Sequence, residues 1–226
     1  MVLDNPHNDS IAKVLEYYEE ADNRVKVIRN EENMGLAMSL NRGIMSSKGA
    51  YIARMDADDI SVPKRIEKQI ALLEEENLDL VFGNCTFIDE DGCIIGAKSP
   101  IPTRNELIRK LLPYGNVVVH PTVIMRRAAL DITGLYRNFK TSQDYDLWLR
   151  FLSSGLKLGA VNESLLYYRI RKNSISSTKR YQQWLTSEFQ RYLYFEREKT
   201  GQDSFSDGAL QVFFVKNRLY REDHVE

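Results

Sequence analysis

The sequence has few cysteines, no long apolar run and almost no net charge, and each of these limits what the protein can be. Two cysteines in 226 residues exclude a disulfide-dense scaffold. No stretch of consecutive apolar residues is longer than four, which predicts neither a transmembrane helix nor a signal-peptide core. With 31 Lys and Arg against 32 Asp and Glu, the formal net charge is -1, which argues against a nucleic-acid binder. We therefore expect a soluble, cytoplasmic globular protein.

The two cysteines flank a hairpin turn predicted at Asp91-Gly92. In that hairpin Cys93 would lie opposite Glu90 and Cys85 opposite Lys98, so a disulfide between the two cysteines is unfavourable. Their spacing also fits neither a zinc site nor a redox dithiol. We expect two reduced cysteines in strands.

The first hundred residues alternate between helical and extended periodicities. Helices are expected at about 10–18, 35–46 and from Pro63, and strands at 25–28, 50–55 and 80–82. The expected inward residues of the second and third helices are Leu36, Leu40, Ile44, Ile66, Ile70 and Leu73. This alternation predicts an α/β layer built on a largely parallel sheet.

From about residue 84 the pattern changes to α+β. A hairpin at 86–95 is followed by a capping box at Thr103–Glu106, which predicts the start of a helix. Strands are expected at 117–119, 122–125 and 165–169, with a helix at 145–152 between them. The tail, about 178–222, reads as two helices separated by Gly201.

An acidic run, Asp56-Ala57-Asp58-Asp59, follows the strand at 50–55. Clustered carboxylates raise one another's pKa unless a cation neutralises them, and Asp oxygens suit a hard divalent ion such as Mg²⁺ or Mn²⁺. The alternative is a solvated turn before a helix, whose dipole would favour an acid such as Asp59. For an isolated Asp-x-Asp the solvated turn would be the better interpretation.

Several ordered motifs change that weighting. They are Asn33–Ala37, Asn41–Gly43, Lys48–Asp59, His120–Val123, Gly134–Tyr136 and Ser142–Arg150. From Val2 to about Ser177 the sequence resembles the family 2 glycosyltransferases. The resemblance implies an inverting, nucleotide-diphospho-sugar-dependent enzyme of hexosyl or N-acetylhexosaminyl type. It implies a GT-A fold, a Rossmann-like three-layer α/β/α sandwich. Residues 1–177 would be the catalytic domain, with the nucleotide-sugar half to about 100 and the acceptor half after it, and 178–226 a helical extension.

The resemblance also assigns residues to the donor. It implies that Asp58 ligates Mn²⁺ or Mg²⁺ and that Asp56 contacts the ribose or the metal. A bound cation stabilises the charge that grows on the leaving diphosphate. The other residues matching the nucleotide-sugar site are Asp4, Asn33, Gly35, Asn41 and Arg54.

In the acceptor half the resemblance places the general base at Asp144, which would take the proton from the attacking hydroxyl. The family often has Glu at the preceding position, where this chain has Gln143. Without the family, Asp144 would be interpreted as a first-turn acid favoured by the helix dipole.

Two basic positions stay open. His120 either lines the acceptor site or is a buried imidazole bonded to backbone. Related enzymes commonly carry a His near position 171, where this chain has Arg171. Arg cannot ligate a metal but can pair bidentately with phosphate. Arg171 therefore either closes over the diphosphate, alone or with Lys172, or belongs to a solvated basic loop.

The resemblance begins at the family's second strand, and Met1 stands where an apolar strand residue is expected. A start codon placed inside a longer reading frame, a deliberate truncation or a degenerate gene would all look like this. Loss of a central strand would expose sheet edges, so we expect poor stability or homo-oligomerisation.

The tail carries an aromatic stripe comprising Tyr181, Trp184, Phe189 and Tyr192. Such a stripe could contact a membrane surface carrying lipid-linked acceptors, at the inner face of the membrane. Packing on the chain's own domain or a partner is the favoured interpretation.

Function is expected in cell-surface polysaccharide or glycolipid synthesis, with a saccharide or lipid-linked acceptor and no nucleic acid. Two alternatives remain. One is a non-catalytic remnant that binds sugar nucleotides. The other is a nucleotidyltransferase, which would need a Gly-rich basic loop that is not visible in the sequence.

Overall fold

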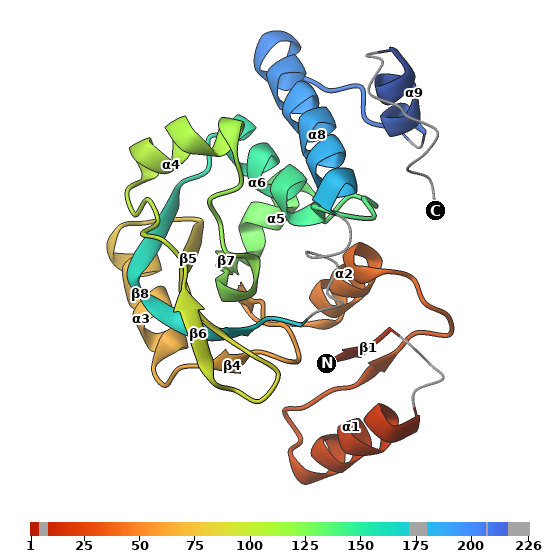
Figure 1. Ribbon diagram of the computed structural model, residues 1–226, viewed down its shortest axis with the longest axis vertical. Coiled ribbons are helices and arrows are strands. Elements are labelled where there is room, and N and C mark those ends of the chain that lie inside the picture. The colour runs from red at the N-terminus through yellow and green to blue at the C-terminus, as the bar shows by residue number, and fades with distance from the viewer. Residues whose placement is uncertain (5–8, 172–179, 207, 217–226) are drawn as a thin grey trace.

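The computed structural model describes residues 1–4, 9–171, 180–206 and 208–216, and Figure 1 shows how they are arranged. In chain order the elements are β1 (Val2–Leu3), α1 (Asp9–Ala21), β2 (Ile28–Arg29), α2 (Leu36–Ser46), β3 (Tyr51–Ala53), β4 (Ile60–Ser61), α3 (Arg65–Glu75), β5 (Leu80–Ile88), β6 (Ile94–Ala97), α4 (Asn105–Leu111), the 3₁₀ helices η1 (Leu112–Tyr114) and η2 (His120–Thr122), β7 (Ile124–Arg126), α5 (Arg127–Thr133), α6 (Gln143–Ser153), β8 (Leu158–Arg169), α8 (Arg180–Thr200) and α9 (Ala209–Lys216).

The main sheet has six strands in the order β3-β7-β5-β8-β4, with β6 pairing on β5. β1 and β2 form a separate parallel pair. The expectation of a largely parallel sheet is wrong for the main sheet, because β5 and β8 are the parallel pair there and its other described pairs are antiparallel. β7 lies between β3 and β5 and runs antiparallel to both. Helix–strand alternation along the first half of the chain could not reveal a strand inserted from the second half.

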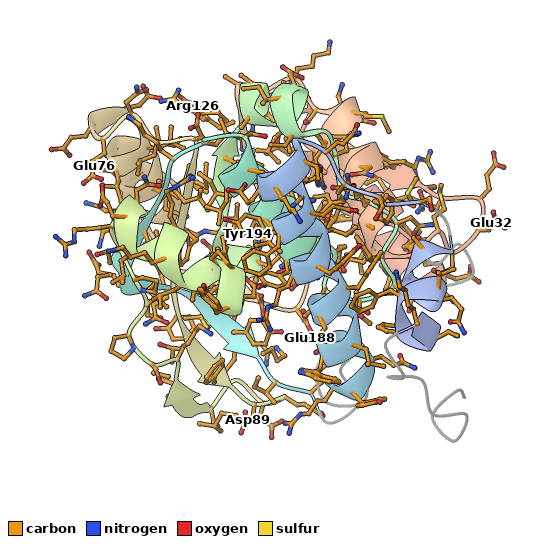
Figure 2. The ribbon with its side chains drawn as sticks, turned by 90° about the horizontal axis from the view of Figure 1, so that it is seen from above. Glu32, Glu76, Asp89, Arg126, Glu188 and Tyr194 are labelled. Carbon is orange, nitrogen blue, oxygen red and sulfur yellow. The ribbon has the colours of Figure 1, made fainter. Side chains whose placement is uncertain are left out.

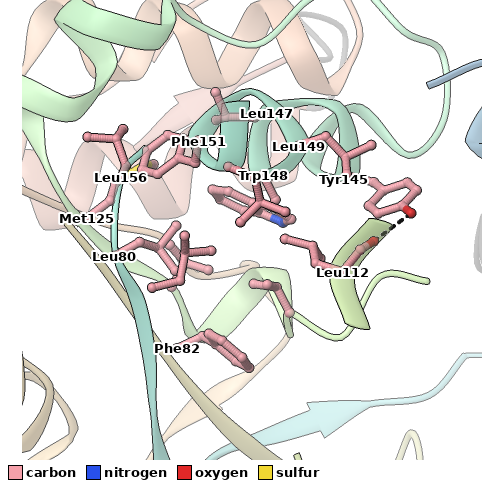
Figure 3. Packing of buried hydrophobic residues seen from close by; sticks show 14 of the residues in the cluster. Leu80, Phe82, Leu112, Met125, Tyr145, Leu147, Trp148, Leu149, Phe151 and Leu156 are labelled. Atoms are coloured by element: carbon pink, nitrogen blue, oxygen red, sulfur yellow. Dashed lines mark hydrogen bonds between the residues drawn. The ribbon is translucent and has the colours of Figure 1, made fainter. Parts of the chain in front are cut away.

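The core lies between α6 and the main sheet. α6 is buried almost all round, as expected of a central helix, and its Trp148 and Phe151 pack edge to face. Figure 3 shows these rings facing Leu80 and Phe82 of β5. Burying each large side chain stabilises the fold by roughly 1.5–3 kcal/mol. The expectation that Trp148 is a core residue is confirmed.

Helix α3 does not present the face expected from its apolar residues. Ile66 is exposed, whereas Arg65, Gln69 and Leu73 are buried. The Gln69 Nε2 amide donates to the carbonyls of Val81, at 3.0 Å, and Thr122, at 2.7 Å. These backbone carbonyls of β5 and η2 face α3 and need a hydrogen-bond donor there. An apolar side chain could not supply one.

Two other helices also bury less apolar surface than expected. In α2, Ile44 is buried and Leu40 packs against the core, but Leu36 is exposed. Helix α1 forms as expected, yet none of its residues is buried, and Val14 and Tyr17 are exposed.

The β5–β6 hairpin forms with free cysteines, as expected, but Cys93 lies just before β6 rather than in a strand. Cys85 is buried and Cys93 exposed, and the Lys98 amide donates to the Cys85 carbonyl as predicted. Cys93 is one residue out of the expected register, because its carbonyl accepts from the Asp89 amide rather than facing Glu90.

Two local predictions in the second half are wrong. Residues 117–119 form no strand, because the Val118 amide bonds to the Asn116 side chain and the Val119 carbonyl begins a turn to Thr122. Helix α4 is not capped by Thr103. Its N-cap is Arg104, which makes no side-chain capping bond.

The described tail forms two helices separated by Gly201, as predicted, because α8 ends at Thr200 and Gly201 has φ +82°. Leu185 and Phe189 of α8 are buried, whereas Trp184 and Tyr192 are exposed. The aromatic stripe is therefore split, with one part packed on the chain's own domain and the other facing solvent. None of the helices in the described segments is both long enough and apolar enough to cross a membrane.

Replacing Gly83 by Ala should lower the free energy of unfolding by roughly 1–3 kcal/mol, because the central β5–β8 pair has no room for a methyl group. A Cβ at Gly83 would lie 2.3 Å from Leu165 Cδ1 and 2.7 Å from its Cγ, and Leu165 is fully buried. Urea unfolding of both proteins measures the difference.

Gly96→Ala is the matched control, since a Cβ there would meet Phe87 at an ordinary 3.9 Å. Equal losses from the two substitutions would show that the close approach at Gly83 has no energetic weight.

Candidate active site

The acidic loop begins where β3 ends. The Arg54 side chain is buried, and its guanidinium binds both oxygens of the Asp56 carboxylate, with Nη1 2.8 Å from Oδ2. Such a two-bond pair fixes both side chains. The charge of Asp56 is thus compensated within the chain.

Arg65 of α3 holds the backbone next to the Arg54–Asp56 pair. Its Nη2 donates to the Arg54 carbonyl at 2.7 Å and its Nε to Gln69 Oε1 at 3.0 Å. Burial lowers the pKa of Arg65 to about 10, which leaves it charged at neutral pH. The backbone that presents Arg54 is therefore held from α3.

The rest of the acidic loop is fastened to the end of β8. The Arg169 amide donates to Asp59 Oδ1, and Arg169 Nε donates to the Asp58 carbonyl, both at 2.9 Å. Arg169 Nη1 also binds the carbonyls of Asp89, 2.8 Å away, and Glu90. Figure 2 labels Asp89 at the end of the β5–β6 hairpin. One guanidinium thus joins three segments.

Asp59 is not the helix-terminus acid of the alternative interpretation. It is buried and precedes the short strand β4 rather than a helix. Burial raises its pKa to about 6, against the opposing effect of the bond from the Arg169 amide. Asp59 therefore anchors the loop.

Asp58 and Arg171 meet, as the hypothesis of a shared diphosphate site requires. Arg171 Nε lies 2.9 Å from Asp58 Oδ2, and both side chains are partly exposed. Lys172 lies outside the described residues. Arg171 is therefore close enough to act on whatever Asp58 binds.

The carboxylates of Asp56 and Asp58 fit a hard divalent cation that takes most of its ligands from phosphate oxygens and water rather than from the protein. In the part of the chain that the structure describes, no three His, Cys, Asp or Glu side chains come together as a metal site. Mg²⁺ and similar ions are commonly held by one or two carboxylates together with phosphate oxygens and water. Both carboxylates are paired within the chain, but the partner of Asp58 is the exposed Arg171, whereas Asp56 is bound through both oxygens by the buried Arg54. An exposed arginine can be displaced more readily, so Asp58 fits this role better than Asp56.

Asp144 lies in the first turn of α6, partly buried. The Asn116 Nδ2 amide donates to its Oδ2 at 2.8 Å. Burial raises the pKa of Asp144, while the bond from Asn116 and the charge of Arg54 oppose that rise. Asn116 is a site residue that sequence reasoning missed, and no spacing signal in the sequence links it to Asp144.

His120 is a half-buried imidazole, and it bonds to a side chain rather than to backbone. Its Nε2 lies 2.9 Å from the Tyr136 hydroxyl, and its ring contacts Trp148 edge-on. Burial holds the pKa of His120 well below its usual value, so the imidazole is neutral. This favours the structural interpretation over an acceptor contact.

Arg54 links the two halves of the site. It pairs with Asp56, and its charge also acts on the pKa of Asp144 and of the buried Tyr136. The Arg54 amide donates to the Val123 carbonyl at 2.9 Å, and His120 of the same segment contacts Trp148 of α6. Residues 120–123 thus join the acidic loop to α6, although more than eighty residues separate Asp56 from Asp144 in the chain.

Asp4 lies at the end of β1, where it organises the entry to α2. Its Oδ1 accepts from Asn30 Nδ2 at 2.7 Å, Ser39 Oγ at 2.8 Å and the Met34 amide at 2.9 Å. Burial raises the pKa of Asp4, but these bonds outweigh it and the pKa is lowered overall. Asp4 is therefore an ionised acceptor.

Asn33 and Gly35 form the turn before α2. The Asn33 side chain accepts from the Gly35 amide at 3.0 Å, and Gly35 has φ +79°, which glycine adopts without strain. Asn41, by contrast, points inward. It is buried, and its amide makes two bonds with the backbone of Tyr136, so it joins α2 to the segment before α6.

The chain matches known proteins over much of its length. A family model described as Glycosyl transferase family 2 matches residues 1–133. An uncharacterized glycosyltransferase of Methanocaldococcus jannaschii, MJ1057, is 36% identical over 80% of this chain and 63% of its own length. The O-antigen biosynthesis glycosyltransferase WbnJ of Escherichia coli is 37% identical over 73% of this chain and 64% of its own. The chain thus spans under two thirds of the length of these relatives.

Solved structures match it as well. Staphylococcus aureus TarS 1-349 in complex with UDP-GlcNAc superposes with a TM-score of 0.63 at 18% identity, over 84% of this chain and 56% of that one. The mannosyltransferase PcManGT of Pyrobaculum calidifontis, in complex with GDP-Man and Mn²⁺, gives 0.58 at 12% identity, over 84% and 52%. These likenesses confirm the predicted GT-A α/β fold.

Proposed function

The chain belongs to glycosyltransferase family 2, and from this premise we propose that it moves a sugar from a nucleotide-diphosphate donor to an acceptor hydroxyl with inversion at the anomeric carbon. One observation carries the proposal. Buried Arg54 pairs with Asp56, and residues 120–123, to which its backbone bonds, contact α6, the helix that bears Asp144, so acids suited to the donor and to the acceptor stand on joined elements.

At the donor end, Asp58 and Arg171 would receive the diphosphate. Asp58 would hold Mn²⁺ or Mg²⁺, with Asp56 in a supporting position, and a bound cation would stabilise the negative charge of the leaving group. Arg171 would pair with phosphate oxygens. The TarS and PcManGT structures contain UDP-GlcNAc and GDP-Man, which supports a nucleotide-sugar donor carrying a hexose or an N-acetylhexosamine.

The matching turn at Asp4, Asn33 and Gly35 would contact the nucleoside. Asp4 already accepts three hydrogen bonds at one oxygen, so its role there would be to fix the turn as well as to meet the nucleotide. Asn41 would act indirectly, by holding the Tyr136 backbone.

At the acceptor end, Asp144 would be the base. Its carboxylate takes the hydroxyl proton while the acceptor oxygen forms a bond to the anomeric carbon. The bond from that carbon to the diphosphate breaks, and its electron pair leaves with the diphosphate. Attack opposite the leaving group inverts the configuration. The name of the relative WbnJ refers to O-antigen biosynthesis, which supports a saccharide or lipid-linked acceptor.

A donor panel tests this function. UDP- and GDP-sugars are incubated with the protein, Mn²⁺ and a saccharide acceptor, and nucleoside diphosphate release and the anomeric configuration of the product are measured. We expect diphosphate release and an inverted product. Pyrophosphate release from a nucleoside triphosphate and a sugar phosphate would instead identify a nucleotidyltransferase, and donor binding without turnover a non-catalytic protein.

Arg171→Ala should raise the donor KM about tenfold and leave kcat nearly unchanged, because a charge-assisted bond to phosphate contributes to donor binding on the order of 1.5–3 kcal/mol. Initial rates over a range of donor concentrations measure both constants. Arg24→Ala, at an Arg paired with Asp22 on the surface, is the control. An unchanged KM would mean that Arg171 belongs to a solvated loop.

A further inference from the structure

Ser142, immediately before α6, has an unusual backbone. It is the N-cap of this helix and adopts the left-handed conformation, with φ 55° and ψ 25°. Left-handed backbone is unfavourable for residues other than glycine and persists only where the surroundings impose it. Asp144 follows two residues later, so the direction of its carboxylate depends on this turn.

The tail helix α8 holds that turn. Gln190 Nε2 donates to the Ser142 carbonyl at 2.9 Å, and Thr186 Oγ1 accepts from Thr141 Oγ1 at 3.2 Å. Gln190 and Thr186 are buried and lie four residues apart, on one face of α8.

The same helix packs along α6 and the segment leading to it. Figure 2 shows α8 lying across α6, and the two helices are in contact. The ring of Phe189, next to Gln190, packs edge to face on Phe139. The turn at Ser142 is thus enclosed by α8 through both polar and apolar contacts.

The chemistry of Gln190 suits a positioning role better than a purely stabilising one. Its side chain is fully buried, and its Oε1 has no hydrogen-bond partner among the described residues. An unsatisfied buried oxygen is unfavourable, so an apolar side chain would serve stability alone at least as well. The polar contribution of Gln190 is its hydrogen bond to the Ser142 carbonyl.

We propose that Gln190 is a positioning residue for the transfer reaction, which acts by holding Ser142 in the left-handed turn that aims Asp144. The inference rests on the proposed role of Asp144 as base. Under this proposal α8, which lies outside the segment matched by the family model, helps to position the catalytic base.

The test is a rescue experiment on the full chain. Gln190→Met removes the bond while keeping the volume, and should lower kcat about tenfold with the donor KM within twofold, since small misplacements of a reacting group cost rate. Adding Ser142→Gly should restore most of the lost kcat, because glycine adopts this conformation without strain. Ser142→Gly alone gives the reference kcat against which the double variant is compared.

Ser187→Ala, which removes a bond within α8 itself, is the control and should leave kcat unchanged. An unaltered kcat in Gln190→Met, or a loss that Ser142→Gly does not rescue, would overturn the inference. If Gln190→Met does not fold, Ser142→Val replaces it. A β-branched residue disfavours the turn, so full activity of Ser142→Val would be equally damaging.

Asp144→Asn, assayed in parallel, distinguishes failure of the base assignment from failure of the positioning role of Gln190. If Asp144→Asn keeps its transfer rate, the base assignment fails and the inference fails with it. If Asp144→Asn is inactive while Gln190→Met is fully active, the base assignment stands and the role of Gln190 is refuted.

Discussion

Replacing Asp144 by Asn should lower kcat for sugar transfer by about three orders of magnitude while leaving donor affinity within about twofold, because a general base contributes roughly 10²–10⁴-fold to the rate. Asn has the shape of Asp but cannot take the acceptor proton. Steady-state rates and calorimetric donor binding together measure the two quantities.

The pH profile gives this prediction a second readout. Burial raises the pKa of Asp144 above its usual value near 3.8, and a base works only when deprotonated. Activity should therefore fall as the pH drops through this raised pKa, and the acidic limb should begin above pH 3.8. Asn116→Ala removes a bond that lowers the pKa, so it should move the limb to higher pH.

Asp131→Asn is the matched control, since Asp131 is an exposed acid on the neighbouring helix α5. It should change neither kcat nor the pH profile. An Asp144→Asn protein that retained the acidic limb would show that another group titrates in the reaction.

Replacing Asp58 by Asn should lower kcat/KM about a hundredfold at a fixed Mn²⁺ concentration and raise the Mn²⁺ concentration that gives half-maximal rate. In the proposed function the Asp58 carboxylate would help to hold the cation, and a bound cation would stabilise the developing charge on the leaving group by several kcal/mol. Titrating Mn²⁺ after EDTA treatment measures the effect.

Two comparisons sharpen the result. Asp91→Asn, in the exposed hairpin turn, should leave the Mn²⁺ titration unchanged. Asp56→Asn removes the partner of buried Arg54, so it should reduce stability as well as activity, whereas Asp58→Asn should mainly affect activity. If Asp58→Asn leaves the half-maximal Mn²⁺ concentration at the wild-type value, Asp58 is not a metal ligand.

The sequence pointed to the carboxylates of the candidate site but not to the side chains that they contact. Asp56, Asp58 and Asp144 stand in motifs whose order along the chain is informative. Arg54 was expected at the donor, but its link to Asp144 depends on how the acidic loop meets α6 in space. Asn116 could not be found, because a single hydrogen bond across a loop leaves no periodicity or spacing in the sequence.

The fold was predictable in its elements and less so in its pairings. Most helices formed near the positions that the hydrophobic pattern indicated, although α5 was not expected, and the GT-A arrangement followed the motifs. The position of β7 could not be predicted in this way, because β7 pairs with β3 and β5, which lie much earlier in the sequence. The inward face of α3 was misjudged for a related reason. Its Arg65 and Gln69 satisfy backbone carbonyls, and counting apolar residues assigns polar ones to solvent.

The contacts of Arg169 with the acidic loop and the β5–β6 hairpin limit how the sequence of the hairpin tip can vary. Its guanidinium binds backbone carbonyls at Asp58, Asp89 and Glu90, and a carbonyl is the same whatever side chain the residue bears. Glu90 can therefore change identity without loosening the clamp, whereas adding or deleting a residue in the hairpin tip would move these carbonyls off the guanidinium. At this edge of the candidate site, loop length is constrained more tightly than loop composition.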